Sequence, residues 1–246
     1  MSYTSSQLLE FLDRVRATST LEEAWDIYMA EIAKYGATHA GYGVVTPGPS
    51  DDSPARVIRY FDYREDFLQR YDEAGHFLND SSIHHCLLRK PEPLVSTDPA
   101  FLASLSAGQL RVAQESFDFG IRHFVTFTLG EGADHGGVNI SFGHSSEREF
   151  HDLLRAHLDT LRLTSILFHN AIRARPFLGE RLMLSAREKE CLRWVGAGLE
   201  SKAIAHRIGI STRTVEHHVA NAIDKLGANS RAHAVAKALI LNLIEL

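Results

Sequence analysis

Cysteine is scarce in this chain, since only Cys86 and Cys191 occur among 246 residues. The two are far apart in sequence and lie among apolar residues, so we expect buried thiols and neither a disulfide framework nor a metal site. The chain also lacks any run approaching ~18 consecutive apolar residues. Its first residues lack the basic flank and apolar stretch of a signal peptide. We therefore expect a cytoplasmic protein that does not enter a membrane.

The sequence also lacks the short motifs of common enzyme classes. No G-x-S-x-G turn, H-E-x-x-H helix or phosphate-binding loop is present, which disfavours an enzyme using Ser, His and Asp residues. His217 and His218 are adjacent, but neighbouring residues on a helix diverge by ~100° and do not readily share a metal ion. We therefore expect no cofactor and no metal site.

Charge is distributed unevenly along the chain. The overall net charge is -5. Residues 180–246 contain 10 Lys and Arg against 7 Asp and Glu, a net charge of +3, so the rest of the chain carries -8. A positive field confined to one segment is typical of a nucleic-acid reader. The length also favours two domains, and the split in charge fits a sensor fused to a DNA-binding segment.

Helical and strand-like patterns alternate over the first 172 residues. Apolar residues recur at helical spacing in 5–35 and predict two amphipathic helices, and polar loop residues separate strand-like segments at 38–45 and 55–62. Further along we expect helices at 64–74, 104–119 and 147–172, strands at 123–129 and 137–143, and a proline-containing loop at 87–100. This order predicts an α+β fold, an α-β-α sandwich whose antiparallel sheet can enclose a ligand.

The C-terminal segment begins after a break in the helical pattern. Pro176 and Gly179 interrupt residues 173–183, which we expect to link a domain at 1–172 to a domain at 184–246. Ser185 and Glu188 form a capping-box pattern, and Gly198 supplies a helix stop. A short helix at 201–208, a turn at 209–211, a helix at 212–226 and a last helix at 232–246 follow. This is a four-helix, all-α domain with a helix-turn-helix, whose second helix enters the major groove of DNA.

Residues 184–244 resemble the DNA-binding domain of LuxR-type regulators along their whole length. The matching positions are Leu184, Arg187, Glu188, Leu192, Gly198, Ile204, Ala205, Thr214, Val215, His218, Asn221, Lys225, Leu226, Arg231 and Ala234. In that family dimers read palindromic sites in double-stranded DNA. The resemblance therefore implies a homodimer, to which the last helix at 232–246 can contribute part of its apolar face.

The same resemblance implies which residues meet DNA. The groove-facing side carries Glu216, His217 and Ala220, flanked by Arg213 and Asn221. Glu216 can accept from a cytosine amino group, and His217 can donate to a purine N7. Glu216 is unusual, because family members often have a basic residue there. The expected phosphate contacts, which fix position and make binding salt-dependent, are Lys202, Thr212, Thr214, Lys225 and Arg231.

Residues 5–172 resemble the autoinducer-binding domain of quorum-sensing LuxR-type regulators, which sense N-acyl-homoserine lactones. The resemblance is carried by residues 63–83, where Tyr63, Phe67, Tyr71 and Asp80 stand at the pocket positions of that family. A phosphoacceptor receiver domain is not indicated. The chain lacks its acidic pair near the start, its Asp after the third strand and its later Lys.

The resemblance assigns the pocket a chemistry. An amide and a lactone in a largely apolar cavity need few, well-placed hydrogen bonds. Asp80 would accept from the ligand amide N–H, and Tyr63 and Ser141 would donate to the acyl carbonyl. Tyr71 would pack along the acyl chain, and the wall would be completed by Val95, Phe124 and Val138.

The chain also departs from the pocket pattern of the family. Where the family has a Trp that donates to the lactone carbonyl, this chain has Phe67, and where the family has a Pro after the Asp, it has Ser81. A second family Trp is replaced by Val95, and a family Gly is replaced by Phe124. Losing a donor to a buried carbonyl costs roughly 1 to 3 kcal/mol. A reshaped pocket for a longer acyl chain, a different lipid-like signal or a plant compound fits these changes equally well.

The sequence therefore leaves three alternative functions to compare. The first is a DNA-binding regulator that responds to an acyl-homoserine lactone or a close analogue. The second is an orphan regulator that senses another molecule, or a regulator or partner-binding antagonist that acts without ligand. The third, an enzyme, is disfavoured by the missing motifs. The sequence does not reveal whether the free or the bound protein is the DNA-competent state.

Overall fold

The structure is a computed structural model that describes residues 5–46, 55–130, 134–143, 146–175, 180–182, 184–241 and 243–245. The chain divides into two compact units, Met1–Val44 with Ile58–Leu178, and Val45–Val57 with Gly179–Leu246. Among the described residues, no helix is both long enough and apolar enough to cross a bilayer. Cys86 and Cys191 are both free and buried, as the sequence predicts.

The first unit confirms the α+β fold expected from the sequence. Its elements are α1 (Ser5–Ala17), α2 (Leu21–Ala33), β1 (His39–Thr46), β2 (Ala55–Phe61), α3 (Glu65–Glu73), the 3-10 helix η1 (His76–Asn79), α4 (Ser81–Leu87), β3 (Leu94–Val95), α5 (Pro99–Ser104), α6 (Ala107–Asp118), β4 (Phe124–Thr128), β5 (His135–Ser141) and α7 (Glu147–Arg173). The sequence analysis did not predict η1 and α4. It also misses β3 and the start of α5, which lie in the segment expected to be a loop.

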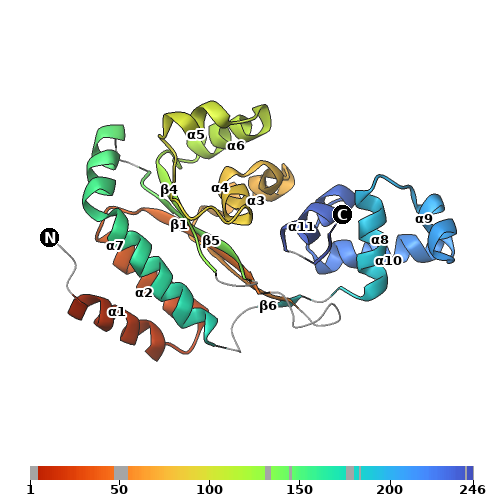
Figure 1. Cartoon of the computed structure of the whole chain (residues 1–246), viewed down its shortest axis with the longest axis horizontal. Coiled ribbons are helices and arrows are strands. Elements are labelled where there is room, and N and C mark those ends of the chain that lie inside the picture. The colour runs from red at the N-terminus through yellow and green to blue at the C-terminus, as the bar shows by residue number, and fades with distance from the viewer. Residues whose placement is uncertain are drawn as a thin grey trace. The chain divides into compact units, whose positions relative to one another are not determined.

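The sheet separates two layers of helices. Its strand order is β3-β4-β5-β1-β2, and β4 pairs antiparallel with β5, with Phe124 opposite Ser141 and Thr126 opposite Asn139. Figure 1 shows α1, α2 and α7 on one side of the sheet and α3 to α6 on the other. The first unit is therefore a three-layer sandwich, as expected.

The two faces of the sheet differ in chemistry. On the side of α1, α2 and α7, large apolar side chains form the main core, among them Trp25, Tyr28 and Phe168, each no more than 2% exposed. Alternate residues of the strands join this core, including Phe127 of β4 and Ile140 of β5. Because successive residues of a strand point to opposite faces, their neighbours in sequence point towards α3 and α4. Those neighbours are largely polar.

The second unit contains the helix-turn-helix. Its helices are α8 (Ala186–Gly196), α9 (Ser201–Ile208), α10 (Thr212–Lys225) and α11 (Arg231–Ile240), so the expected four-helix, all-α domain is confirmed. The short strand β6 (Glu180–Leu182) lies within the segment expected to be a linker, and its Leu182 pairs with Ala55, a residue of this same unit at the start of β2.

Local signals explain where these helices begin and end. Ser185 caps α8 in a complete capping box, in which its hydroxyl accepts from the Glu188 amide and the Glu188 carboxylate accepts from the Ser185 amide. Gly198 has a φ of +83° and Gly209 a φ of +71°, a region that favours glycine, and the chain turns after α8 and after α9 at these residues. The capping box and both stops agree with the sequence analysis.

Candidate ligand site and DNA interface

A partly buried polar cluster occupies the space between α3, α4 and strands β4 and β5. Tyr63 follows β2 and enters this space because Gly41 of β1 has no side chain. A Cβ at Gly41 would lie 3.1 Å from Tyr63 Cε2 and 3.0 Å from Phe61 Cδ1. The Tyr63 hydroxyl donates to Asn139 Oδ1 at 3.0 Å and lies 3.5 Å from Ser141 Oγ. Tyr63 and Ser141, which the sequence assigns to one ligand carbonyl, are therefore neighbours.

Asp80 has two kinds of partner. Its Oδ1 accepts from the backbone amides of Ser82 at 2.7 Å and Ile83 at 3.2 Å, which caps the N-terminus of α4. Its Oδ2 accepts from the Tyr71 hydroxyl at 2.7 Å. Tyr71 is thus a hydrogen-bonding partner of Asp80, whereas the sequence analysis gave it only apolar contact.

The surroundings of Tyr63 and Tyr71 raise the pKa of both phenols. Desolvation raises the pKa of Tyr63 far above its usual value, and the charge of Asp80 adds to this effect. Desolvation also raises the pKa of Tyr71, again with a contribution from Asp80. Both hydroxyls, which an ordinary tyrosine also keeps protonated at neutral pH, therefore remain donors well into the alkaline range.

Asn139 connects this cluster to the sheet. Its Oδ1 accepts from Tyr63 and also from Ser141 Oγ at 3.1 Å. Its Nδ2 donates at 3.0 Å to both Ser82 Oγ and Thr126 Oγ1. Thr126 in turn donates to Ser82 at 2.9 Å. One amide therefore joins two strands, the start of α4 and the segment after β2.

Aromatic rings extend the cluster on the helical side. Phe67 of α3 is buried, and its ring centroid lies 5.7 Å from that of Tyr63, 5.8 Å from that of Tyr71 and 5.2 Å from that of Phe119. These distances are typical of attractive aromatic pairs. Phe124 faces the same side, because it stands directly opposite Ser141 in the β4–β5 pair. An apolar wall therefore adjoins the polar groups.

A charged cluster ties the covering helices together. Arg70 of α3 donates to both carboxylate oxygens of Glu115 on α6, at 2.8 and 3.2 Å. His76 Nε2 lies 2.8 Å from Glu115 Oε2. The hydrogen bonds from Arg70, followed by that from His76, lower the pKa of Glu115. Glu115 therefore fixes α3 and η1 against α6 above the polar cluster.

Two of the expected wall residues lie on the opposite face of the sheet. Val138 is 1% exposed within the main core, and Val95 packs against that core. Val95 stands opposite Val125, a core residue, whereas its neighbour Leu94 stands opposite Thr126 on the polar side. The structure thus brings together Tyr63, Phe67, Tyr71, Asp80, Phe124 and Ser141 but not Val95 and Val138.

The sequence analysis overlooked Asn139, Thr126, Ser82 and Leu94, which lie on the polar side. The available signal was the period of two along each strand. If Ser141 faces the site, Asn139 faces it as well and Val138 does not. Applying that alternation consistently would have exchanged Val138 for Asn139. Ser82 had no such signal, because α4 was not expected.

The exposed side of α10 carries the expected base-reading residues. Val215, Val219 and Ala222 are buried in the unit, while Arg213, Glu216, His217 and Ala220 are exposed. Asn221 is half-buried, and its Nδ2 lies 3.2 Å from His217 Nε2, one turn away. Arg213, Glu216, His217, Ala220 and Asn221 therefore share the solvent side of the recognition helix, next to exposed Thr212 at its start.

Several expected phosphate contacts already have partners within the chain. Lys225 Nζ donates to both carboxylate oxygens of Glu188, at 3.0 and 2.8 Å. Arg231 Nη2 donates to Ser201 Oγ at 2.7 Å. The Thr214 hydroxyl lies 2.7 Å from Ser211 Oγ at the cap of α10. These side chains support the packing of the helix-turn-helix.

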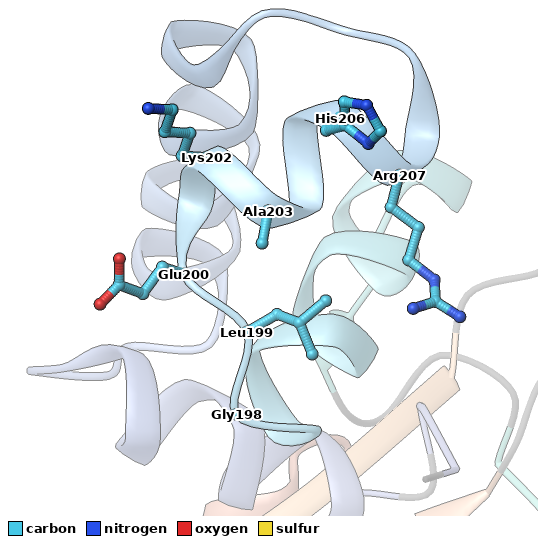
Figure 2. A pocket seen from close by; sticks show the side chains of 7 residues that line it. All are labelled: Gly198, Leu199, Glu200, Lys202, Ala203, His206 and Arg207. Atoms are coloured by element: carbon cyan, nitrogen blue, oxygen red, sulfur yellow. The ribbon is translucent and has the colours of Figure 1, made fainter.

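Lys202 differs from these residues because it projects into solvent from α9. Figure 2 shows it at the edge of an open hollow lined by Gly198, Leu199, Glu200, Lys202, Ala203, His206 and Arg207. The Arg207 guanidinium lies 4.0 Å from the centre of the Trp194 ring, a cation–π contact that holds it against α8. Lys202 is exposed on α9, so its expected contact with a phosphate stays a prediction.

Comparison with known proteins identifies the class of both units. Residues 182–238 match the family of bacterial regulatory proteins of the luxR type, and residues 20–172 match the autoinducer-binding domain. The second match covers more than half of the chain. The chain belongs to the LuxR family of transcription regulators, with an autoinducer-binding domain and a LuxR-type helix-turn-helix domain.

Individual relatives agree with this assignment. A putative HTH-type transcriptional regulator, y4qH of Sinorhizobium fredii, is 30% identical over 98% of this chain and 74% of its own length. Among solved structures, SdiA in complex with octanoyl-rac-glycerol has a TM-score of 0.52 at 20% identity, over the full length of both chains. CepR2 of Burkholderia cenocepacia, an N-acylhomoserine lactone dependent factor, has a TM-score of 0.51 at 18% identity, covering 70% of this chain and 98% of its own. The two structures support the fold.

Proposed function

We propose that this protein is a cytoplasmic transcription regulator that senses an N-acyl-homoserine lactone and binds palindromic promoter sites as a homodimer. The observation that carries the ligand assignment is one hydrogen-bonded cluster, in which Ser82 and Asn139 connect Asp80 to Tyr63 and Ser141. A carboxylate acceptor beside two hydroxyl donors complements an acylated amine, which offers one N–H and one carbonyl. Phe67 and Phe124 supply apolar surface for the acyl chain.

The known ligands of structural relatives are consistent with this chemistry. CepR2 depends on N-acylhomoserine lactone, and SdiA binds octanoyl-rac-glycerol. Both ligands have an acyl chain and an ester carbonyl, but only the lactone has an amide N–H. Asp80 would accept from that N–H, as it would from a hydroxyl group of the glycerol ester, so its carboxylate is compatible with both ligands.

Thermal unfolding of the full chain with a series of N-acyl-homoserine lactones tests the ligand class. A ligand that binds only the native state raises the unfolding temperature by mass action. We expect such a rise for at least one chain length and a smaller rise for Asp80→Asn. Asn keeps an oxygen that can cap α4 but loses the charge that attracts the amide. Asp98→Asn is the matched control, because Asp98 caps α5 and is exposed. Unchanged unfolding temperatures across the series would exclude the lactones tested.

The DNA assignment rests on the exposed side of α10. Two copies related by a two-fold axis would present two such helices, and the spacing of the half-sites would follow the helical repeat of DNA. Sedimentation velocity of the full chain, with and without a duplex carrying two half-sites, tests this. We expect a dimer that prefers two half-sites to one. A monomer with equal affinity for both duplexes would exclude the dimeric mode.

The second candidate is a regulator of the same class that folds and binds DNA without ligand. The observation that favours it is the complete hydrogen bonding of Asn139, which leaves the polar cluster satisfied within the chain itself. DNA binding by protein made without any lactone, unchanged when lactone is added, would support this candidate over the first.

A further inference from the structure

The Asn139 side chain uses its whole hydrogen-bonding capacity inside the protein. An amide has two acceptor lone pairs and two N–H donors. In Asn139 the oxygen accepts from Tyr63 and Ser141, at 3.0 and 3.1 Å, and the nitrogen donates to Ser82 and Thr126, at 3.0 Å each. No capacity is left for another molecule.

The two donors to Asn139 are also committed. A hydroxyl group carries one proton, so Tyr63 and Ser141 each donate one hydrogen bond. Ser141 is fully buried and Tyr63 is half-buried, and desolvation raises the pKa of Tyr63, so both hydroxyls remain protonated. While these protons point to Asn139 Oδ1, they are not available to a second carbonyl.

We propose that Asn139 is a built-in competitor for the carbonyl group of the ligand, a role that rests on the proposed ligand site around Asp80. Its side-chain carbonyl accepts from the pair of donors that a ligand carbonyl would use. A carbonyl ligand must either displace the Asn139 amide or bind without Tyr63 and Ser141. Exchanging one carbonyl for another gains little, because the number of hydrogen bonds stays the same.

Asn139 also holds the unliganded site together. It bridges β5 to β4 through Thr126 and to the start of α4 through Ser82. Without an acceptor at this point, the hydroxyl protons of buried Ser141 and half-buried Tyr63 would lose their partner in the free protein, which is unfavourable. The same residue therefore stabilises the free protein and lowers its affinity for ligand.

The variant Asn139→Ala of the full chain tests both roles, the stabilisation of the free protein and the lowering of its ligand affinity. N-octanoyl-homoserine lactone is the probe ligand. We expect its Kd, measured by calorimetric titration, to fall about tenfold to a hundredfold, because the ligand carbonyl then meets unpaired donors. The unfolding temperature without lactone should fall at the same time. Asn170→Ala, on the exposed side of α7, is the control and should change neither quantity. Asn139→Ser is the second variant if the alanine variant does not fold.

Combining this variant with Tyr63→Phe tests the competition itself. We expect Tyr63→Phe to raise the Kd about tenfold in the Asn139→Ala background and less than about threefold in the wild type, since Tyr63 is committed to Asn139 there. Equal factors in both backgrounds would overturn the proposal. An equal Kd for wild type and Asn139→Ala would overturn it as well, while leaving the ligand site intact. Absence of binding by wild type and all variants would instead overturn the proposed lactone ligand.

Discussion

Lys225 and Glu188 form a two-pronged ion pair between α10 and α8, with Nζ at 3.0 and 2.8 Å from the two carboxylate oxygens. The Glu188 side chain is 4% exposed and that of Lys225 is 41% exposed. Glu188 also accepts from the Ser185 amide at 2.8 Å. One carboxylate thus closes the capping box of the first helix of this unit and fixes the recognition helix to it.

Lys225→Ala should therefore lower the folding stability of the DNA-binding unit even when no DNA is present. Removing the lysine leaves a buried carboxylate without its charged partner, which we expect to lower the free energy of unfolding by about 1 to 3 kcal/mol, reduced by the exposure of the lysine. Urea unfolding measures this. Lys202→Ala, at an exposed lysine, is the control and should change stability by less than about 0.5 kcal/mol. Equal losses would contradict a structural role for Lys225.

The Glu188 carboxyl should make this unit less stable as the pH falls into the acid range. Burial acts to raise the pKa of Glu188, but the hydrogen bonds from Lys225 and the Ser185 backbone outweigh it, and the pKa lies below its usual value. A lowered pKa in the folded state gives stability that is present above the unfolded pKa and is lost as pH falls through the folded one. Unfolding followed from pH 7 down to about 3 should therefore show a shallower acid slope in Glu188→Gln than in wild type. Identical slopes would contradict the assignment.

Glu216→Ala should change which sequences are preferred. Glu216 is exposed on α10, where a carboxylate would accept from a cytosine amino group and repel phosphates. Binding to a randomised pool, followed by sequencing, should show a weaker cytosine preference at one position and stronger nonspecific binding. Equal relative changes on specific and scrambled sites would argue against base reading.

Lys202→Ala should weaken binding to all sequences alike. Lys202 is exposed at the edge of the hollow in Figure 2, and a phosphate contact carries no sequence information. Titrations at several salt concentrations should give a log–log slope reduced in magnitude by about 1. Arg148→Ala, an exposed residue of α7 in the other unit, should leave the slope unchanged. A slope unaffected by Lys202→Ala would exclude a phosphate contact.

Asp80→Ala should destabilise the ligand-binding unit even without ligand. It removes the cap of α4, at about 1 to 2 kcal/mol, and leaves the Tyr71 hydroxyl without an acceptor, at about 1 to 3 kcal/mol. Asp98→Ala removes a comparable cap from α5 at an exposed position. The loss of stability on denaturant unfolding should be clearly larger for Asp80. Equal losses would show that the bond to Tyr71 contributes nothing.

The sequence by itself determined the features that depend on neighbouring residues. The capping box of Ser185 and Glu188 lies within four consecutive residues, and the stops at Gly198 and Gly209 need only a backbone that favours glycine. The spacing of apolar residues similarly predicted the helices α1, α2 and α7 and the strands β1, β2, β4 and β5. Such signals lie within one turn or one strand and can be seen before the chain is folded.

Only the tertiary structure decided which groups meet across the fold. The family resemblance predicts that Lys225 contacts a phosphate, and the fold in addition pairs it with Glu188, which is far from it in sequence. Val138 and Asn139 are neighbours in sequence, but strand alternation places the first in the core and the second among Tyr63, Ser141 and Thr126. The face on which each residue lies depends on the pairing and burial of the whole sheet. Alternation along the strand shows that Val138 and Asn139 face opposite sides, but which side is the core and which is the site is decided by the packing of the whole sheet.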